Sequence, residues 1–291
     1  MTDAPVQPAI PAQPTTPAQP TPAPSPTFHE QDLSSARFER VSLRAAGFSE
    51  VYLTDARFRQ VDLTGAQFQA VRFRDVRMRG VDFVNVEISG EVSNLVVYGV
   101  DVMPFVEAEL NRRMPERTKM RPETADGFRE AWAILERLWA ATVERARQLP
   151  EPALHESVDG EWSFIQTLRH VAFASACWVD RMILGEVRPW RAGELPWDEA
   201  PPGEWFSWDR DVRLSLDEAL ALRAHRQSTV RELMAKLTDE DLARTVTRTE
   251  DGHPQEVDVP VRECLYVLLN EEWKHRLFAE RDLAVLAAKE H

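Results

Sequence analysis

The chain has 291 residues, which exceeds one typical domain and indicates about two. Hydrophobic residues make up 43% of it, enough for a sizeable core, and the net charge is -13. An acidic excess this large argues against non-specific nucleic-acid binding, which needs clustered lysine and arginine.

The sequence shows no signal for export or for a membrane. Its start lacks the basic and apolar regions of a signal peptide. The longest charge-free apolar run, Val171 to Val179, is far shorter than the ~20 residues that span a bilayer. Cys177 and Cys264 lie in apolar helical sequence, which favours buried free thiols over a disulfide. We therefore expect a soluble cytoplasmic protein with no membrane partner.

Residues 1–30 are predicted to form a disordered proline-rich tail. Nine of the twenty prolines fall between Pro5 and Pro26, and Asp3 is the only charged side chain before residue 28. Such a segment has almost nothing to bury and favours a solvated polyproline-II conformation. A tether is the simpler interpretation, and a docking motif for a proline-reading domain is the alternative.

Residues 31–92 carry the strongest pattern in the sequence, a large apolar residue at every fifth position. The series is Leu33, Phe38, Leu43, Phe48, Leu53, Phe58, Leu63, Phe68, Phe73, Met78, Phe83 and Ile88. From the second repeat onward, an alanine or valine stands two residues before each of them. A period of five fits neither a helix nor a strand. It fits a chain that turns a corner every five residues and sends two apolar side chains inward each time.

This pattern resembles the pentapeptide-repeat family, whose fold is a right-handed quadrilateral β-helix. Four sides make one coil, so the resemblance implies three coils with parallel backbone ladders between them. Some members mimic DNA and bind topoisomerases through a long acidic face. Here nine arginines stand against seven acids from Arg37 to Gly90, a net charge of +2 that does not imitate a polyanion. Docking of another protein partner is the interaction role that stays open.

After Gly90 the period fails, and residues 93–123 are expected to hold a capping helix and a linker. The segment from Val92 to Val102 is compatible with a continuing strand. Pro104 to Arg113 is predicted to be a helix that caps the open end of the solenoid, and Pro115 to Glu123 a charged linker.

Residues 124–291 are predicted to form an up-down four-helix bundle, so the whole chain is a multidomain α and β protein. The expected helices run from Asp126 to about Gln148, from Ser163 to about Gly185, from Ser215 to about Leu237, and from about Val261 to the C-terminus. Capping boxes mark the starts of the second and third helices. The loop of residues 186–214 between them is long and rich in tryptophan, which is typical of a functional loop.

Two of the seven histidines, His170 and His275, fall where a helix face is expected to turn inward. Glu271 precedes His275 by four residues, so both side chains project from one face, one turn apart. Burying that carboxylate is costly unless it is paired or bound to a cation. With His170 from a facing helix, the pair makes an N,N,O set of the kind found in catalytic zinc sites.

The same residues also allow a purely structural arrangement. Glu271 could form an internal hydrogen bond with His275, or an ion pair with Arg169 or Arg281 across the bundle. Glu272 lies on a neighbouring face and is a weaker candidate for a ligand.

Residues 126–289 resemble the DinB-like superfamily of four-helix bundles, which includes thiol-dependent transferases and maleylpyruvate isomerases. The resemblance rests on the segments Glu161-Trp-Ser-Phe-Ile-Gln-Thr-Leu-Arg-His170, Asn270-Glu-Glu-Trp-Lys-His275 and Arg281-Asp282-Leu283. In that family the first segment's histidine and a pair four residues apart on the last helix bind the metal. The Glu-x-x-x-His form of the pair resembles the mycothiol-dependent isomerase branch. The resemblance implies His170, Glu271 and His275 as ligands of one divalent ion, zinc first and nickel or another ion as alternatives.

The activity that this resemblance implies is the activation of a low-molecular-weight thiol, which attacks an electrophilic small-molecule substrate. Cys177 is a poor candidate for the nucleophile. It lies two turns from His170, about 10 Å along the helix axis, in apolar sequence that should raise its pKa. Trp162, Trp190 and Trp197 are candidates for the wall of the pocket. The rival function is a non-catalytic interaction scaffold built on the repeats, which would need no bound ion.

Overall fold

The computed structural model describes residues 27–198, 200 and 206–289. The predicted proline-rich tail therefore lies outside the described residues, except for its last four. The chain divides into two compact units, Met1–Asp82 and Phe83–His291. The division falls inside the repeats, ten residues before the end of the predicted repeat domain. Among the described helices, none is both long enough and apolar enough to cross a bilayer.

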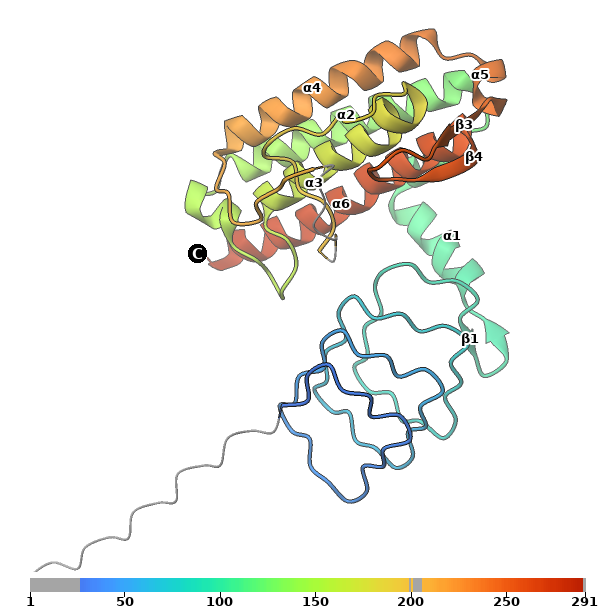
Figure 1. Ribbon diagram of the computed structural model, residues 1–291, viewed down its shortest axis with the longest axis vertical. Coiled ribbons are helices and arrows are strands. Elements are labelled where there is room, and N and C mark those ends of the chain that lie inside the picture. Colours follow the sequence, from blue (N-terminus) through green and yellow to red (C-terminus); the bar gives the residue numbers. More distant parts are fainter. Residues whose placement is uncertain (1–26, 199, 201–205, 290–291) are drawn as a thin grey trace, which may run out of the picture. The chain divides into compact units, whose positions relative to one another are not determined.

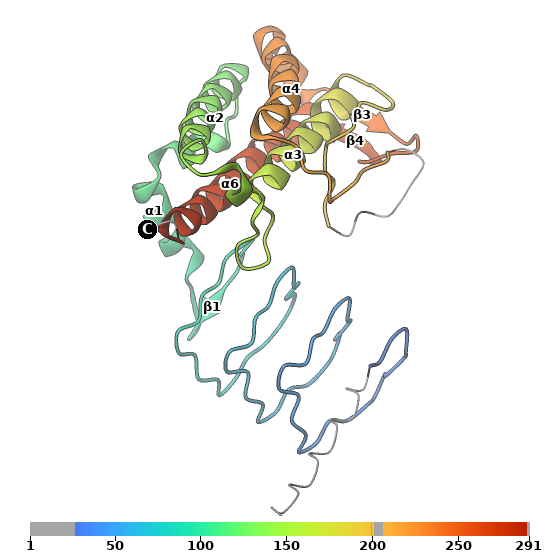
Figure 2. The same ribbon diagram turned by 90° about the vertical axis from the view of Figure 1, so that its left-hand side faces the viewer.

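The repeats turn at every fifth residue, as the sequence pattern predicts. A backbone φ in the left-handed region recurs at Glu30, Ser35, Arg40, Ala45, Glu50, Asp55, Gln60, Gly65, Ala70, Asp75, Gly80, Asn85 and Gly90. On alternate repeats a backbone hydrogen bond closes the corner, such as the one from the N–H of Ala56 to the carbonyl of Leu53 at 3.1 Å. The backbone consequently winds in successive coils (Figures 1 and 2).

The large apolar side chains of these coils are exposed in the structure. Phe48 and Phe58 are each 65% exposed, and Leu53 is 54% exposed. Between residues 27 and 90 no backbone hydrogen bond joins one coil to the next, so neighbouring coils do not cover these side chains. The structure therefore differs from the stacked interior that the pattern predicts, and the closed β-helix stays a prediction.

The second unit is mainly helical, and its long helices begin and end near the expected positions. They are α2 (Ala125–Ala146), α3 (Phe164–Ser175), α4 (Leu216–Lys236) and α6 (Val261–Lys289). Helix α3 packs on α4 and α6, and α2 packs on α6, so these helices lie side by side (Figures 1 and 2). Both predicted capping boxes are present, with Ser163 bonded to Gln166 and Ser215 to Glu218.

Shorter elements precede and connect the long helices. They are β1 (Val96–Val97), β2 (Val100–Asp101), α1 (Met103–Arg113), the 3-10 helices η1 (Pro115–Met120) and η2 (Glu151–His155), the π-helix η3 (Ala176–Ile183), α5 (Asp239–Ala243), β3 (Thr245–Arg248) and β4 (Glu256–Pro260). Strands β1 and β2 form a small antiparallel hairpin where a single strand was expected. The 3-10 helix η1 occupies most of the segment from Pro115 to Glu123 that was expected to be a linker. The antiparallel pair of β3 and β4 was not predicted, because neither strand is long enough to show a clear alternation of apolar residues.

Helix α3 continues as the π-helix η3 instead of remaining α-helical to its end. The N–H of Leu184 donates to the carbonyl of Val179, five residues earlier, at 2.9 Å. The segment carries Asp180 and Arg181 into the interior, where they are 3% and 0% exposed. Such π-helical turns are rare and often lie at functional sites. Here the turn buries two charged side chains that contact the loops around the candidate site.

An apolar core lies between the long helices. One cluster includes Phe128 of α2 and Leu268 of α6, and a second includes Trp139 of α2 and Leu283 of α6. Burying each such leucine or phenylalanine stabilises the fold by about 1.5–3 kcal/mol. This core fixes the relative positions of α3 and α6, the two helices that carry the candidate site.

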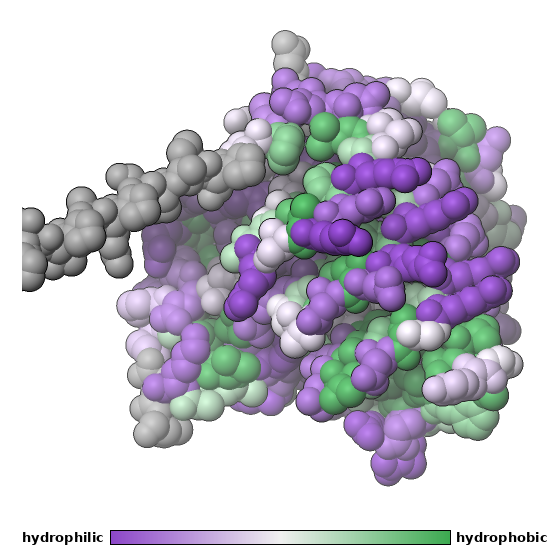
Figure 3. All heavy atoms as spheres, turned by 90° about the horizontal axis from the view of Figure 1, so that it is seen from below, coloured by the Kyte–Doolittle hydropathy of each residue, from purple (hydrophilic) through white to green (hydrophobic). Residues whose placement is uncertain are grey.

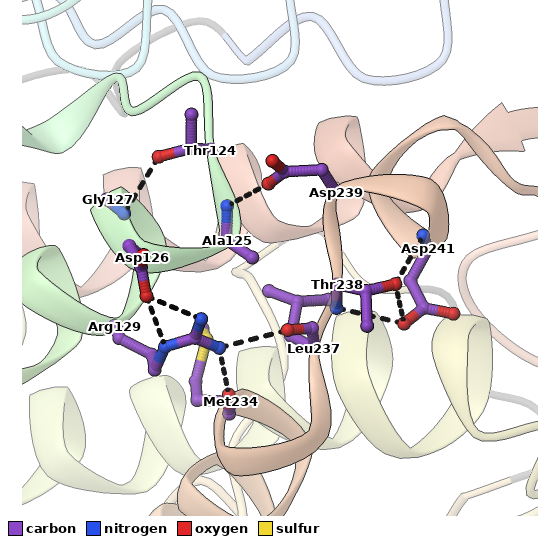
Figure 4. Close-up of polar contacts among 10 residues, drawn as sticks. All are labelled: Thr124, Ala125, Asp126, Gly127, Arg129, Met234, Leu237, Thr238, Asp239 and Asp241. Carbon is purple, nitrogen blue, oxygen red and sulfur yellow. Dashed lines mark hydrogen bonds and ion pairs between the residues drawn. The ribbon is translucent and has the colours of Figure 1, made fainter.

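Polar contacts join the ends of α2, α4 and α5 (Figure 4). Arg129 of α2 donates to the carbonyls of Met234 at 2.9 Å and Leu237 at 3.0 Å, where α4 ends. Carbonyls in the last turn of a helix have no partner within the helix, so Arg129 supplies one from outside. The N–H of Ala125 donates to Asp239 at 2.7 Å and so joins the start of α2 to α5.

Replacing Arg129 with methionine should lower the free energy of unfolding by about 1–2 kcal/mol, because two buried carbonyls lose their donor. Arg137→Met on the same helix is the control. Arg137 is 61% exposed and pairs with Glu116 at 3.3 Å, so its loss should cost less than about 0.5 kcal/mol. Urea denaturation measures both values. Equal destabilisation by the two changes would contradict the capping role of Arg129.

Candidate metal centre

His170, Glu271 and His275 lie together between α3 and α6. Oε2 of Glu271 is 3.5 Å from Nε2 of His170 and 3.0 Å from Nε2 of His275. One donor atom from each residue lies within 4.8 Å of the other two. His170 is buried, and Glu271 and His275 are half-buried. The structure thus brings together the three residues that the sequence singled out.

Local structure explains this convergence. On α6, the spacing of four residues places Glu271 and His275 one above the other on the face that meets α3. On α3, His170 lies two turns after the capping box, on a helix buried on nearly every side. The rings of His170 and His275 are 4.7 Å apart, centroid to centroid. The packing of α3 on α6 therefore brings two imidazoles and one carboxylate close together.

A hydrogen bond to the long loop fixes the tautomer of His170. Its Nδ1 lies 3.0 Å from the carbonyl oxygen of Leu195. A carbonyl only accepts, so Nδ1 carries a hydrogen, and in the neutral ring Nε2 presents a lone pair. That lone pair faces Oε2 of Glu271, a second acceptor, across 3.5 Å. The arrangement needs a second proton on His170, a proton on Glu271, or a cation between the two atoms.

Burial disfavours the second proton. It lowers the pKa of His170, despite the opposing effect of Glu271. Burial by itself would raise the pKa of Glu271, but the contacts with His170 and His275 hold that pKa well below its ordinary value. A neutral imidazole and an ionised carboxylate are the protonation states that bind metals. Two donors bound tetrahedrally at ~2.1 Å from an ion would be about 3.4 Å apart, so the donor set fits a divalent ion.

Two of the structural alternatives for Glu271 are not seen. Arg169 donates to backbone carbonyls of the long loop, and Arg281 pairs with Asp282 at 2.6 Å. The third alternative is present, since Glu271 and His275 are within hydrogen-bonding distance at 3.0 Å. That contact alone places neither a proton nor a cation between Nε2 of His170 and Oε2 of Glu271.

Glu272, the weaker candidate, points away from the centre. It is 1% exposed and pairs with Arg223 of α4 at 2.6 Å. The guanidinium of Arg223 also lies over the ring of Trp139, 4.3 Å from its centroid. Glu272 therefore belongs to a separate buried ion pair that joins α4 to α6.

Trp162, a predicted pocket residue, contacts both histidines. Its ring centroid is 4.3 Å from that of His170 and 5.6 Å from that of His275, nearly parallel to the latter at 14°. The indole N–H donates to Asp198 of the long loop at 2.7 Å. Sequence reasoning missed Asp198, because nothing in the local pattern links two residues so far apart in the chain.

Trp190 and Trp197, the other predicted pocket residues, are one ring removed from the centre. Phe173 lies between, with its centroid 6.2 Å from that of His170, 6.5 Å from Trp190 and 6.3 Å from Trp197. The two tryptophans therefore contact Phe173, and their place in the wall of a pocket stays a prediction. The sequence offered no signal for Phe173, which lies on an almost entirely apolar helix.

The cysteines are free and buried, as expected. Sγ of Cys177 accepts a hydrogen bond from the indole of Trp190 at 3.2 Å. Burial raises the pKa of Cys177 strongly and that of Cys264 to about 12. Both side chains are therefore thiols at neutral pH, and neither is a reactive thiolate.

Buried Arg169 holds the long loop against α3. Its guanidinium donates to the backbone carbonyls of Gly193, Asp209, Arg210 and Val212. Its own carbonyl accepts from the N–H of Leu195 at 3.3 Å. Because Leu195 carries the carbonyl that orients His170, Arg169 links the conformation of the loop to the metal centre.

Arg226 of α4 holds the other side of the same loop. It donates to Glu194 at 2.7 Å, to Asp180 of η3 at 3.1 Å and to the carbonyl of Pro189 at 2.6 Å. Burial raises the pKa of Asp180 to about 6. Glu194 directly precedes Leu195, so this network also fixes the segment that contacts His170.

Arg169→Met should lower the free energy of unfolding by at least about 3 kcal/mol, because four carbonyls lose a charged donor in the interior. It should also speed hydrogen exchange of the amides near Leu195. Arg188→Met is the matched control, since Arg188 lies exposed on the same loop and its loss should cost less than about 0.5 kcal/mol. Chemical denaturation and hydrogen exchange read out both effects. Unchanged exchange near Leu195 in Arg169→Met would contradict the link.

Residues 134–279, half of the chain, match the family described as DinB superfamily, and this segment contains all three candidate ligands. Residues 27–60 and 52–90 match pentapeptide repeats, in eight copies. No curated protein and no solved structure matches the chain.

Proposed function

The chain belongs to the DinB superfamily, and on that premise we propose that its helical domain, an up-down four-helix bundle, binds one divalent ion through His170, Glu271 and His275. Members of this superfamily usually bind a divalent metal. The observation that carries the proposal is the pair of acceptors, Nε2 of His170 and Oε2 of Glu271, that face each other across 3.5 Å. Zinc is the first choice for an N,N,O set, and nickel or another divalent ion is the alternative.

The proposed activity is thiol chemistry. A divalent ion bound at this position lowers the pKa of a bound thiol and keeps it as thiolate. The thiolate would attack an electrophilic carbon of a small substrate. In a transfer it would displace a leaving group, and in an isomerisation it would add to a double bond and leave again after rotation. The pair Glu271 and His275 on α6 supports this choice, because its Glu-x-x-x-His order resembles that of the mycothiol-dependent isomerase branch.

The chain's own residues favour an external thiol. Cys177 is 1% exposed and is bonded to Trp190, and burial raises its pKa, so it does not supply the nucleophile. The ring of Trp162 lies against the rings of His170 and His275, with centroids 4.3 and 5.6 Å away. The proposed nucleophile is therefore a small thiol from solution.

Metal analysis of the purified protein tests the site directly. We expect one divalent ion per chain in the wild type and none in His275→Ala, which loses one ligand of three. His225→Ala is the control, because His225 lies exposed on α4 away from the centre, and it should retain the ion. A wild-type protein that retains no metal after purification without chelator would refute the proposal, and so would equal loss of metal in both variants.

Chelation should also destabilise the protein. A ligand present at 100 times its dissociation constant stabilises the folded state by about 2.7 kcal/mol. Adding a chelator should therefore lower the melting temperature of the wild type and of His225→Ala, but leave that of His275→Ala unchanged. Differential scanning calorimetry with and without EDTA provides the measurement. A chelator effect of the same size in His275→Ala would place the ion elsewhere.

A non-catalytic scaffold is the rival proposal. Assays with mycothiol or glutathione and a panel of electrophiles separate the two. Thiol consumption that requires His275 supports the enzyme. Retained metal with no thiol-dependent turnover would favour a structural or sensory metal, with the repeats as the functional surface.

For residues 31–90 we propose three closed, right-handed square coils. Large apolar side chains that are about half exposed recur along the whole segment, and a continuous apolar surface of this kind is unfavourable in water. Parallel backbone ladders at ~4.8 Å would bring neighbouring coils together and bury both apolar series. The corners at every fifth residue are already those that such a coil needs.

Phe58→Asp should unfold the repeat segment, because a closed coil would bury the new carboxylate without a partner. Tyr52→Asp is the control, because Tyr52 does not belong to either apolar series and is 93% exposed. Limited proteolysis should cut the repeats in Phe58→Asp and leave them intact in Tyr52→Asp. Equal resistance of the two variants would show that Phe58 does not face a closed interior.

A further inference from the structure

The arginines of the repeats gather on one side of the coil. With four sides of five residues each, positions twenty residues apart lie on the same side, so residues 36–40, 56–60 and 76–80 form one side of three successive coils. This side carries Arg37, Arg40, Arg57, Arg59, Arg77 and Arg79 against the single acid Glu39, a net charge of +5. The other three sides of residues 31–90 carry three arginines and seven acids. The small net charge of the repeats thus conceals a basic side, here called the arginine side.

These arginines are outside the two apolar series and are exposed to solvent. Arg37 lies 3.9 Å from Glu39. In the part of the chain that the structure describes, the other five have no ion-pair partner. In the view of Figure 3, strongly hydrophilic side chains lie in rows with hydrophobic side chains between them. The arginine side is therefore a set of six exposed guanidinium groups, five of which have no ion-pair partner among the described residues.

We propose that the arginine side binds an acidic helical segment of a protein partner. Arg37, Arg57 and Arg77 would repeat at the coil spacing of ~4.8 Å, and carboxylates at i and i+4 on a helix are about 5–6 Å apart. Three coils therefore match about two turns of helix. All nine cations of the repeats are arginine and none is lysine, and arginine is the residue that binds carboxylates bidentately.

Nucleic acid fits this side less well. Residues 91–291 carry the remaining net charge of -12, since the repeats from residue 27 balance at nine arginines and nine acids and Asp3 contributes one more. A net negative charge of this size on the rest of the chain repels an extended polyanion. In the proposed closed coil Phe38 and Phe58 would point inward, so the arginine side would present no aromatic residue on which a base could stack. A short acidic helix, by contrast, could bind entirely within the length of the three coils.

Binding of designed peptides to the full chain tests the proposal. The probe is an alanine-rich helical peptide of about 18 residues with glutamates at i, i+4, i+7 and i+11 on one face. A peptide of the same composition with glutamates spread around the helix is its control. We expect the striped peptide to bind more tightly, and its binding to weaken as salt rises. Fluorescence anisotropy measures both affinities.

Two double variants locate the site. Arg57→Gln with Arg77→Gln removes two guanidinium groups from the arginine side, and we expect about a tenfold or greater loss of affinity for the striped peptide. Arg72→Gln with Arg74→Gln removes the same charge from another side and should leave affinity unchanged. Far-UV circular dichroism confirms that each variant is folded.

Several outcomes would overturn the proposal. They are equal loss in both double variants, equal binding of the two peptides, no binding of either peptide, tighter binding of a DNA duplex, and salt-sensitive self-association that Arg57→Gln with Arg77→Gln abolishes. The proposal rests on the square coil, whose failure appears separately in the proteolysis of Phe58→Asp. It is independent of the metal, so the peptide should bind His275→Ala as well as the wild type.

Discussion

A carboxylate placed between two imidazoles in a protein interior is the constraint around which the helical domain is arranged. Withdrawing Glu271 from water costs several kcal/mol unless a positive charge compensates it. The helix pair α3 and α6 brings His170 and His275 to the same carboxylate oxygen at 3.5 and 3.0 Å. Burial lowers the pKa of His170, which disfavours a second proton on the imidazole as the source of that charge. Binding a cation at this position would convert an unfavourable group into part of the fold's stability.

The long loop between η3 and α4 serves this centre through its backbone. Arg169 and Arg226 donate hydrogen bonds to loop carbonyls, and Arg226 also donates to two acids, Glu194 and Asp180. These bonds hold the segment around Leu195. The carbonyl of Leu195 then selects the tautomer of His170. A ligand histidine is generally oriented by a partner on its other nitrogen. In this protein the partner is a main-chain carbonyl, and buried arginines hold the loop that provides it.

The spacing of apolar residues along the sequence predicted most of the helices and turns, because it shows which side of each element faces inward. The spacing of apolar residues predicted the long helices, and the five-residue period predicted the recurring corners of the repeats. The pair Glu271 and His275 could be found for the same reason. Contacts between segments far apart in the chain produce no periodic pattern in the sequence. Thus Asp198, Leu195 and the change from α3 to η3 were out of reach, as were the exposed side chains of the open coils. The arginine side is an intermediate case, since its period of twenty residues appears only after the coil is assumed.

X-ray absorption spectroscopy of the metal-loaded protein tests the central claim most directly. The spectrum at the metal edge should show nitrogen and oxygen donors at about 2.0–2.2 Å, with two imidazole ligands and no sulfur. Adding a small thiol should then introduce one sulfur at about 2.3 Å while both imidazoles remain. A sulfur shell before any thiol is added, or a spectrum with fewer than two imidazoles, would contradict a centre made by His170, Glu271 and His275.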